Sequence, residues 1–276
     1  MIRFSGVSVV YPGTAHPALS DVDLTFRPGE SVAVAGPSGS GKTTLVRLMN
    51  ALVLPSAGVV TVDDLDTKDA GLVWDIRRRV GLIFQNPDNQ FVSTTVEREI
   101  AFGMENIGLP RAEIASRIGE VARRLRLGHL MARPPHRLSG GEKQWVAIAA
   151  VLAMRPACLA LDEPTSLLDG EGRREVWNIL DEIGRSGSHT VVHVTQFADE
   201  IALASRVVVL VAGRVVFDGM PAELFRRRAD LADWGLARPR LLELADRVRG
   251  AGYAVPDPAD SVESIADAIA AGGGGA

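Results

Sequence analysis

Cysteine is almost absent from this chain of 276 residues. The single cysteine, Cys158, excludes an internal disulfide, and its apolar neighbours predict a small buried side chain rather than a reactive thiol. Long apolar runs are also lacking, because the most apolar stretch, residues 207–211, is far too short to span a bilayer. The first residues show no basic-then-apolar signal pattern. We therefore expect a cytoplasmic chain that reaches a membrane only through a partner.

Features that would bind zinc or nucleic acid are missing as well. The five histidines are scattered, and none lies at zinc-ligand spacing from the cysteine. The formal net charge of −4 offers no basic surface, so we expect no nucleic-acid partner. What is present is a composition of 46% apolar and 23% charged residues, which is typical of a globular protein with a sizeable core.

The apolar pattern predicts an α/β core. Strand-forming runs at residues 7–11 and 19–26, separated by the Pro12-Gly13 turn signal, predict antiparallel strands near the N-terminus. From residue 31 onward, short apolar strands alternate with helical patterns. The predicted strands lie at residues 31–35, 59–62, 80–84, 157–161 and 190–195, and the predicted helices lie at residues 43–54, 111–127 and 171–183.

Two segments interrupt or extend this core. Over about residues 86–154 the pattern is helical and polar, which indicates an inserted helical subdomain. Residues 207–216 indicate a hairpin that turns at Ala212-Gly213. The character changes after Pro221, so we expect one domain over residues 1–220 and a helical C-terminal extension over residues 221–276. We expect residues 272–276 to be a disordered tail.

The glycine-rich loop of residues 36–43, Gly-Pro-Ser-Gly-Ser-Gly-Lys-Thr, follows a predicted strand and precedes a predicted helix. Its glycines let backbone N–H groups converge on an anion, at the positive end of the helix dipole. In this context the pattern predicts a nucleotide phosphate site, where Lys42 reaches the β- and γ-phosphates and Thr43 offers its hydroxyl to Mg²⁺. The residues that we expect to contact the nucleotide are Gly36, Ser38, Gly39, Ser40, Gly41, Lys42, Thr43 and Thr44.

An apolar run, residues 159–161, ends in Asp162 and Glu163. Its pattern is that of a buried strand, which places Asp162 to hold Mg²⁺ through water. The carboxylate of Glu163 is then placed to polarise a water for in-line attack on the γ-phosphate. The alternative, a strand end with two solvated acids, loses weight because the phosphate loop is present in the same chain.

A second glycine-rich turn, Leu-Ser-Gly-Gly-Glu at residues 138–142, opens another predicted helix. The Ser139 hydroxyl and the free N–H groups of Gly140 and Gly141 would form a second anion site. An ordinary serine N-cap, with Glu142 completing a capping box, is an alternative that can coexist with this site. The chain cannot easily use this second anion site to bind its own nucleotide, so the motif predicts a dimer with ATP at its interface.

With these motifs in this order, residues 1 to about 220 resemble the ATP-binding-cassette (ABC) ATPases. The resemblance implies a P-loop NTPase (RecA-like) core with an N-terminal antiparallel β subdomain, and two cassettes that pack head to tail across ATP. It also implies that Tyr11 stacks on adenine, that Gln85 reaches Mg²⁺ and the attacking water, and that Asp169 contacts the opposing subunit. For Tyr11 the alternative is an edge-strand tyrosine.

The segments at residues 84–91 and 101–110, the first containing Asn-Pro-Asp-Asn-Gln, resemble those of the energy-coupling-factor ATPases, and so does the tail from Gly235 to Val248. This resemblance implies an ATP hydrolase at the cytoplasmic face of the cell membrane that powers import of a vitamin or a transition-metal ion. Its partners would be a second ATPase subunit, a transmembrane coupling protein that docks at residues 86–90, and a substrate-capturing membrane protein. The transported substrate is contacted by another subunit.

Two positions depart from the family pattern. Gln196 stands where the family usually has a histidine that contacts the γ-phosphate and orients Glu163; a glutamine can still donate a hydrogen bond but is neutral. His193 is a poor substitute, because strand alternation directs it to the opposite face. We hypothesise slow or regulatory hydrolysis at this site, which favours a heterodimer over a homodimer. Trp145 stands where the family usually has an arginine. Two explanations are open: a changed contact between subunits, or a packed face of the helix.

Three other functions fit part of the pattern. An importer ATPase fed by a soluble binding protein is disfavoured by the Asn-Pro-Asp-Asn-Gln run. A non-transport cassette acting on ribosomes or DNA would carry a second cassette or a long coiled-coil insert, and the sequence has neither. A generic nucleotide-binding regulator would leave residues 138–142 unexplained.

Overall fold

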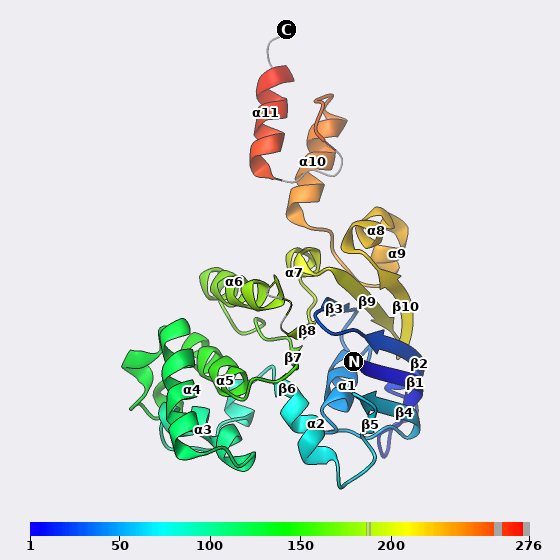
Figure 1. Ribbon diagram of the computed structural model, residues 1–276. Helices are drawn as coiled ribbons and strands as arrows, with labels where there is room; N and C mark the ends of the chain where they lie inside the picture. The colour runs from blue at the N-terminus through cyan, green and yellow to red at the C-terminus, as the bar shows by residue number, and fades with distance from the viewer. Residues whose placement is uncertain (186, 188, 257–260, 273–276) are drawn as a thin grey trace.

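The computed structural model describes residues 1–185, 187, 189–256 and 261–272. Within these residues the strands form two sheets (Figure 1). The first is antiparallel, in the order β2-β1-β4-β5, and the second is mostly parallel, in the order β10-β9-β3-β8-β7-β6. The first sheet comprises β1 (Ile2–Val9), β2 (Leu19–Phe26), β4 (Ala57–Val62) and β5 (Leu65–Asp66). The second comprises β3 (Ser31–Ala35), β6 (Val80–Ile83), β7 (Cys158–Asp162), β8 (Thr190–Val194), β9 (Arg206–Val211) and β10 (Arg214–Gly219). The expected α/β fold with an N-terminal antiparallel β subdomain is thus confirmed.

The central strands are covered on both faces, which is why they are continuous apolar runs. Side chains alternate along β3: Val32 and Val34 join the core that contains β1, β2 and helix α1 (Lys42–Met49), whereas Ala33 and Ala35 join a core on the opposite face. That second core contains α7 (Ala198–Leu203), α8 (Pro221–Arg226) and α9 (Arg228–Asp233). Cys158 is buried within the first core, as its apolar neighbours predict.

The expected helical insert is present as α3 (Val96–Asn106), α4 (Arg111–Arg124) and α5 (Gly140–Ala153), which gather away from the antiparallel sheet (Figure 1). A short 3₁₀ turn at Pro87–Asn89 precedes α3, and two more, at Gly128–Leu130 and Pro135–Arg137, lie between α4 and α5. Their apolar faces share one core with β7 and with α6 (Gly170–Arg185). The remaining helix of the core, α2 (Val73–Arg79), precedes β6.

Two helices end earlier than their apolar patterns predict. Helix α1 ends at Met49 rather than at residue 54, because Ala51 adopts a left-handed φ of 53°. Helix α4 ends at Arg124 rather than at residue 127, and Arg126 likewise has a positive φ of 56°. Neither residue is a glycine, so the sequence carries no signal for these ends.

The C-terminal extension begins after β10 and ends in the helix pair α10 (Arg240–Gly250) and α11 (Val262–Gly272), which projects from the core (Figure 1). Asp246 of α10 ties this helix to the segment before it, since its carboxylate accepts hydrogen bonds from Arg228 of α9 and from Arg238, and one more from Arg249 within α10. The hydrogen bond from Arg238, together with the nearby arginine charges, lowers the pKa of Asp246. The division at residue 220 stays a prediction.

The expected disordered tail is wrong at Gly272, which ends α11. Residues 273–276 lie outside the described residues. Within the described part of the chain, none of the helices has the length and apolar character that a bilayer crossing requires.

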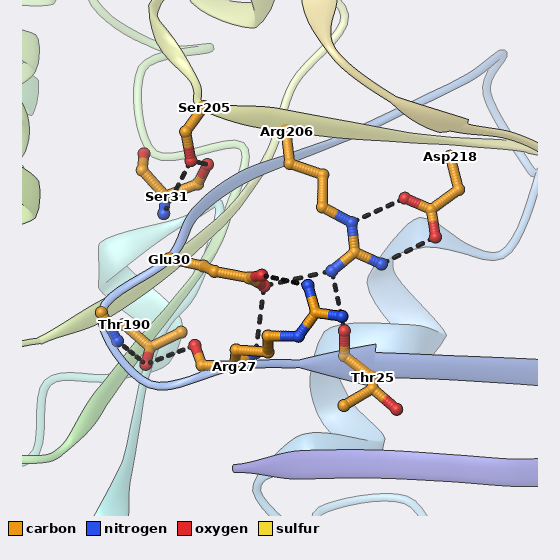
Figure 2. A network of polar contacts seen from close by, with 9 residues as sticks. Thr25, Arg27, Glu30, Ser31, Thr190, Ser205, Arg206 and Asp218 are labelled. Carbon is orange, nitrogen blue, oxygen red and sulfur yellow. Dashed lines mark hydrogen bonds and ion pairs between the residues drawn. The ribbon is translucent and has the colours of Figure 1, made fainter.

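Arg206 joins the two sheets (Figure 2). Its Nε and Nη2 donate to the two carboxylate oxygens of Asp218 at 2.6 and 2.7 Å. Its Nη1 donates to the Thr25 carbonyl of β2 at 2.8 Å and to Glu30 at 3.1 Å. The hydrogen bonds from Arg206 to Asp218, together with the nearby carboxylate charges, raise the pKa of Arg206. The antiparallel sheet is therefore tied to β9 and β10 by one guanidinium.

Replacing Arg206 with alanine should strongly destabilise the chain, because Asp218, Glu30 and the Thr25 carbonyl would all lose a donor. We expect Arg206→Ala to lower the free energy of unfolding by about 2–3 kcal/mol, measured by urea denaturation. Arg124→Ala is the control, since Arg124 pairs with Glu182 through side chains that are 39% and 68% exposed. It should cost less than about 1 kcal/mol. Equal losses for the two variants would contradict the role given to Arg206.

Candidate active site

The glycine-rich loop connects β3 to α1, as its sequence context predicts. Gly36 has a φ of 139°, and a Cβ at this position would lie 2.0 Å from the Leu210 carbonyl oxygen. A Cβ at Gly41, which caps α1 with a φ of 104°, would lie 2.3 Å from the carbonyl oxygen of Ala18. Only glycine fits these two positions, so the loop wraps tightly over the start of the helix.

A cavity of about 530 Å³ opens over this loop, within the size range of small-molecule sites. Five segments of the chain supply its walls: the residue before β2, the glycine-rich loop with the start of α1, and the ends of β6, β7 and β8. The lining residues are Ala18, Ser38, Gly39, Gly41, Lys42, Thr43, Thr44, Gln85, Glu163 and Gln196. Apart from Ala18, which offers no sequence signal, each of these is a residue that the sequence predicts for the site.

Lys42 is the cation of this cavity. Its Nζ donates to the carbonyl oxygens of Gly36 and Pro37, at 2.8 Å each. Burial lowers the pKa of Lys42, and the carboxylates of Glu163 and Asp162 partly offset that effect. A buried ammonium in a glycine-rich loop at the start of a helix is an arrangement that attracts phosphate.

Thr43 lines the cavity and forms an oxygen-rich pair with Asp162, which is buried behind it and is not a lining residue. The Thr43 hydroxyl donates to Asp162 Oδ1 at 2.8 Å. Burial raises the pKa of Asp162, whereas the Thr43 hydrogen bond and the charges of Arg47 and Lys42 oppose that rise. A hydroxyl and one carboxylate fit Mg²⁺, which keeps waters and takes its remaining ligands from substrate phosphates. Within the described residues no cluster of three or more histidine, cysteine or acidic side chains could hold a metal alone.

Glu163 occupies a strained position directly after β7, with a left-handed φ of 47°. Its Oε2 accepts from Gln85 Nε2 at 2.9 Å, so the structure brings together two predicted catalytic residues. Ser166 supports both, because its Oγ accepts from Gln85 at 3.4 Å and donates to the Glu163 carbonyl at 3.1 Å. Burial raises the pKa of Glu163, the charge of Lys42 lowers it, and the charges of Asp162 and Glu200 raise it further.

At the end of β8, Gln196 and His193 lie in different environments. Gln196 is exposed and lines the cavity, where the family pattern places its usual histidine. His193 is 1% exposed and packs edge-on against Trp177, with ring centroids 4.5 Å apart. Burial lowers the pKa of His193 to about 3, so its ring stays neutral. This packing, away from the cavity, supports the expectation that His193 is a poor substitute for the missing histidine.

Tyr11 lies against the first turn of α1, with its hydroxyl 3.2 Å from Thr44 Oγ1. It is half-buried and is not one of the residues that line the cavity. Stacking of Tyr11 on a nucleotide base therefore stays a prediction, supported by the contact of Tyr11 with Thr44, which lines the cavity. Ser40, also predicted for the site, is buried within the loop, 2% exposed.

The second glycine-rich turn lies outside this cavity. Ser139 and Glu142 form the capping box, with Ser139 N–H donating to Glu142 at 2.8 Å and Glu142 N–H donating to Ser139 Oγ at 3.3 Å. Ser139 and Gly140 are exposed, and neither they nor Gly141 line the cavity. Trp145 is half-buried against the core of the helical subdomain, which supports the packed-face alternative.

The sequence pattern of the family described as "ABC transporter" matches residues 19–166. The energy-coupling factor transporter ATP-binding protein EcfA1 of Caldanaerobacter subterraneus is 43% identical over 98% of this chain and 98% of its own length. The protein of the same name from Symbiobacterium thermophilum is 47% identical over 91% of this chain and 88% of its own length.

Solved structures of ABC proteins are similar to this chain as well. The cbiO1 protein of Clostridium perfringens, described as part of the ABC transporter complex cbiONQ, is 32% identical with a TM-score of 0.74, over 84% of this chain and 93% of that one. A dimeric ATP-binding cassette in a post-hydrolysis state, bound to ADP and Pi, is 28% identical with a TM-score of 0.74, over 80% of this chain and 99% of that one.

Proposed function

The chain belongs to the energy-coupling factor ATP-binding proteins of the ABC transporter family, and we propose that it powers import of a vitamin or a transition-metal ion. It is an ABC-type ATP hydrolase coupled to transport. One observation carries the proposal: Lys42, Gln85 and Glu163 line one cavity, whereas the exposed Ser139 turn lies elsewhere on the chain. A second cassette would then bring its own turn, equivalent to residues 138–142 of this chain, to this cavity in a head-to-tail dimer.

The chemistry that we propose is based on the contacts in the cavity. Lys42 and the loop N–H groups hold the β- and γ-phosphates, and Thr43 with Asp162 holds Mg²⁺. When bound, Mg²⁺ would neutralise charge that develops on the phosphate oxygens. Glu163 accepts a proton from the attacking water, and Gln85 orients Glu163 through their 2.9 Å hydrogen bond.

Glu163→Gln tests the assignment of the general base. The amide keeps the size of the side chain but cannot take up the proton, so we expect turnover to fall about 100-fold or more while ATP still binds. Turnover and ATP binding would be measured on the assembled complex, and closed dimers should accumulate with ATP. The control is Glu175→Gln, on the exposed face of α6. Retention of normal turnover in Glu163→Gln would contradict the assignment.

The docking surface that we propose for the membrane coupling protein lies between α2, the end of α1 and α3. Here Trp74, Leu52 and Phe102 line one groove although they are 61%, 45% and 43% exposed. Large apolar side chains gathered at a groove are typical of a protein contact. Phe84, which directly precedes Gln85, also lines this groove, and in the loop after Gln85 the carboxylate of Asp88 pairs with Lys143 of α5 at 2.7 Å. A helix seated here would contact both subdomains at the cytoplasmic face of the membrane.

Charged substitutions in this groove should uncouple the chain from its membrane partner. We expect Trp74→Glu and Phe102→Glu to abolish co-purification with the transmembrane subunits without weakening ATP binding, because the groove lies apart from the nucleotide cavity. Val262→Glu, at a side chain of α11 that is 60% exposed, is the matched control. If the groove variants co-purify as well as the control does, the partner docks elsewhere.

Gln196 supports a division of labour between two different cassettes. Its neutral amide replaces the histidine at this chain's own cavity, whereas the Ser139 turn, which serves the partner's ATP, is complete. We therefore favour a heterodimer, in which one site is altered and the other is intact. In a homodimer both sites would carry the glutamine.

Gln196→His should raise ATP turnover of the assembled complex, if the glutamine slows hydrolysis at this site. An imidazole can contact the γ-phosphate and orient Glu163 in a way that a neutral amide does not reproduce. Steady-state ATP hydrolysis with and without the substitution measures the effect. Unchanged or lower turnover would show that the site is not impaired by Gln196.

A further inference from the structure

Glu200 is a buried carboxylate that has no part in the catalytic roles proposed for the cavity. It lies on α7, is 3% exposed, and is not one of the residues that line the nucleotide cavity. A carboxylate in such a position is destabilising unless hydrogen bonds and charges compensate for the lost water. Its partners therefore indicate what it does.

Both carboxylate oxygens of Glu200 are bound by threonine hydroxyls. Thr165 Oγ1 donates to Oε1 at 2.6 Å, and Thr195 Oγ1 donates to Oε2. Both threonines are 1% exposed, and hydrogen bonds to a charged acceptor are strong where water is excluded. Thr165 follows Glu163 on one loop, and Thr195 directly precedes Gln196 on another. Glu200 thus joins the two loops that supply the base and the amide.

An arginine and an aromatic ring complete the cluster. Arg173 of α6 places its Nε 3.8 Å from Glu200 Oε1, and its guanidinium carbon lies 3.7 Å from the centroid of the Phe197 ring. The Phe197 N–H donates to Thr195 Oγ1 at 3.1 Å. Thr195 and Phe197, on either side of the exposed Gln196, are therefore held by one cluster: Thr195 contacts Glu200 directly, and Phe197 contacts Thr195 and Arg173.

We propose that Glu200 is a positioning residue, which holds the loop that carries Gln196 against the loop that carries Glu163. The inference rests on the proposed function of these two residues in ATP hydrolysis. Gln196 and Glu163 line the nucleotide cavity, so a shift between their loops changes how these two side chains approach the γ-phosphate. A misplacement of about 1 Å can cost about 100-fold in rate. The phosphate loop is held by other contacts, so ATP binding should persist.

The test separates kcat from KM for ATP in the assembled complex. We expect Glu200→Gln to lower kcat about tenfold or more and to change KM by less than about twofold. The matched control is Glu99→Gln: Glu99 is 4% exposed and anchors another loop by accepting the N–H groups of Val92 and Ser93. A kcat for Glu200→Gln no lower than that of the control, or a matching loss of ATP binding, would overturn the proposal.

Thr195 provides a second route to the same answer, including the case where Glu200→Gln folds poorly. Thr195→Val removes the hydroxyl, and Thr195→Ser keeps it. We expect the valine variant to reproduce the fall in kcat and the serine variant to retain normal turnover. In the double variant Thr195→Val/Glu200→Gln, the fall in kcat should be smaller than the product of the two single falls, because both substitutions remove the same contact. A serine variant as impaired as the valine variant would overturn the proposal.

Glu163→Gln distinguishes failure of this inference from failure of the proposed function. If Glu163→Gln abolishes turnover while Glu200→Gln behaves like its control, only the positioning role is wrong. If Glu163→Gln retains full turnover, the proposed hydrolytic roles are wrong and the positioning role is wrong with them.

Discussion

Parallel backbone pairing of β3, β8 and β7 holds three strand ends in one row, and the loops directly after those ends form the candidate site. Val194 of β8 pairs with Val34 of β3 and with Asp162 of β7. The glycine-rich loop, Glu163 and the Gln196 loop therefore leave the sheet at the same edge. Ligands of open α/β sheets bind at this edge because the loops there converge. The rest of the fold keeps that row buried on both faces.

In the proposed head-to-tail dimer, the complete site is divided between two chains. Lys42, Thr43 and Glu163 face one cavity, whereas the Ser139 turn is exposed at the start of α5 in the helical subdomain. The capping box at that turn is compatible with a second function, because it uses the Ser139 hydroxyl and one N–H of the helix start and leaves the turn accessible. Local helix stability and an intermolecular contact can share the same residues.

Polar side chains with several partners each, rather than isolated surface ion pairs, connect the elements of this molecule. Arg206 joins the two sheets, and Asp246 joins the C-terminal helix pair to the preceding segment. Glu200 connects two catalytic loops, and Glu99 anchors the segment after the Gln85 loop. Such groups have few alternative partners where water is excluded, so each one specifies a single arrangement of the elements that it joins.

The sequence by itself determined the chemistry that depends on near neighbours. The spacing of Gly36, Gly41 and Lys42 between a strand and a helix predicts the phosphate loop, and the hairpin at Ala212-Gly213 is found where its turn residues place it. Helix ends at Met49 and Arg124 were not predictable, because a non-glycine residue takes the left-handed turn in each case. Tertiary structure alone decided the partners of Glu200 and Arg206. Arg206 bonds a carbonyl 181 residues away, and no periodicity in a sequence encodes which distant strand will supply it.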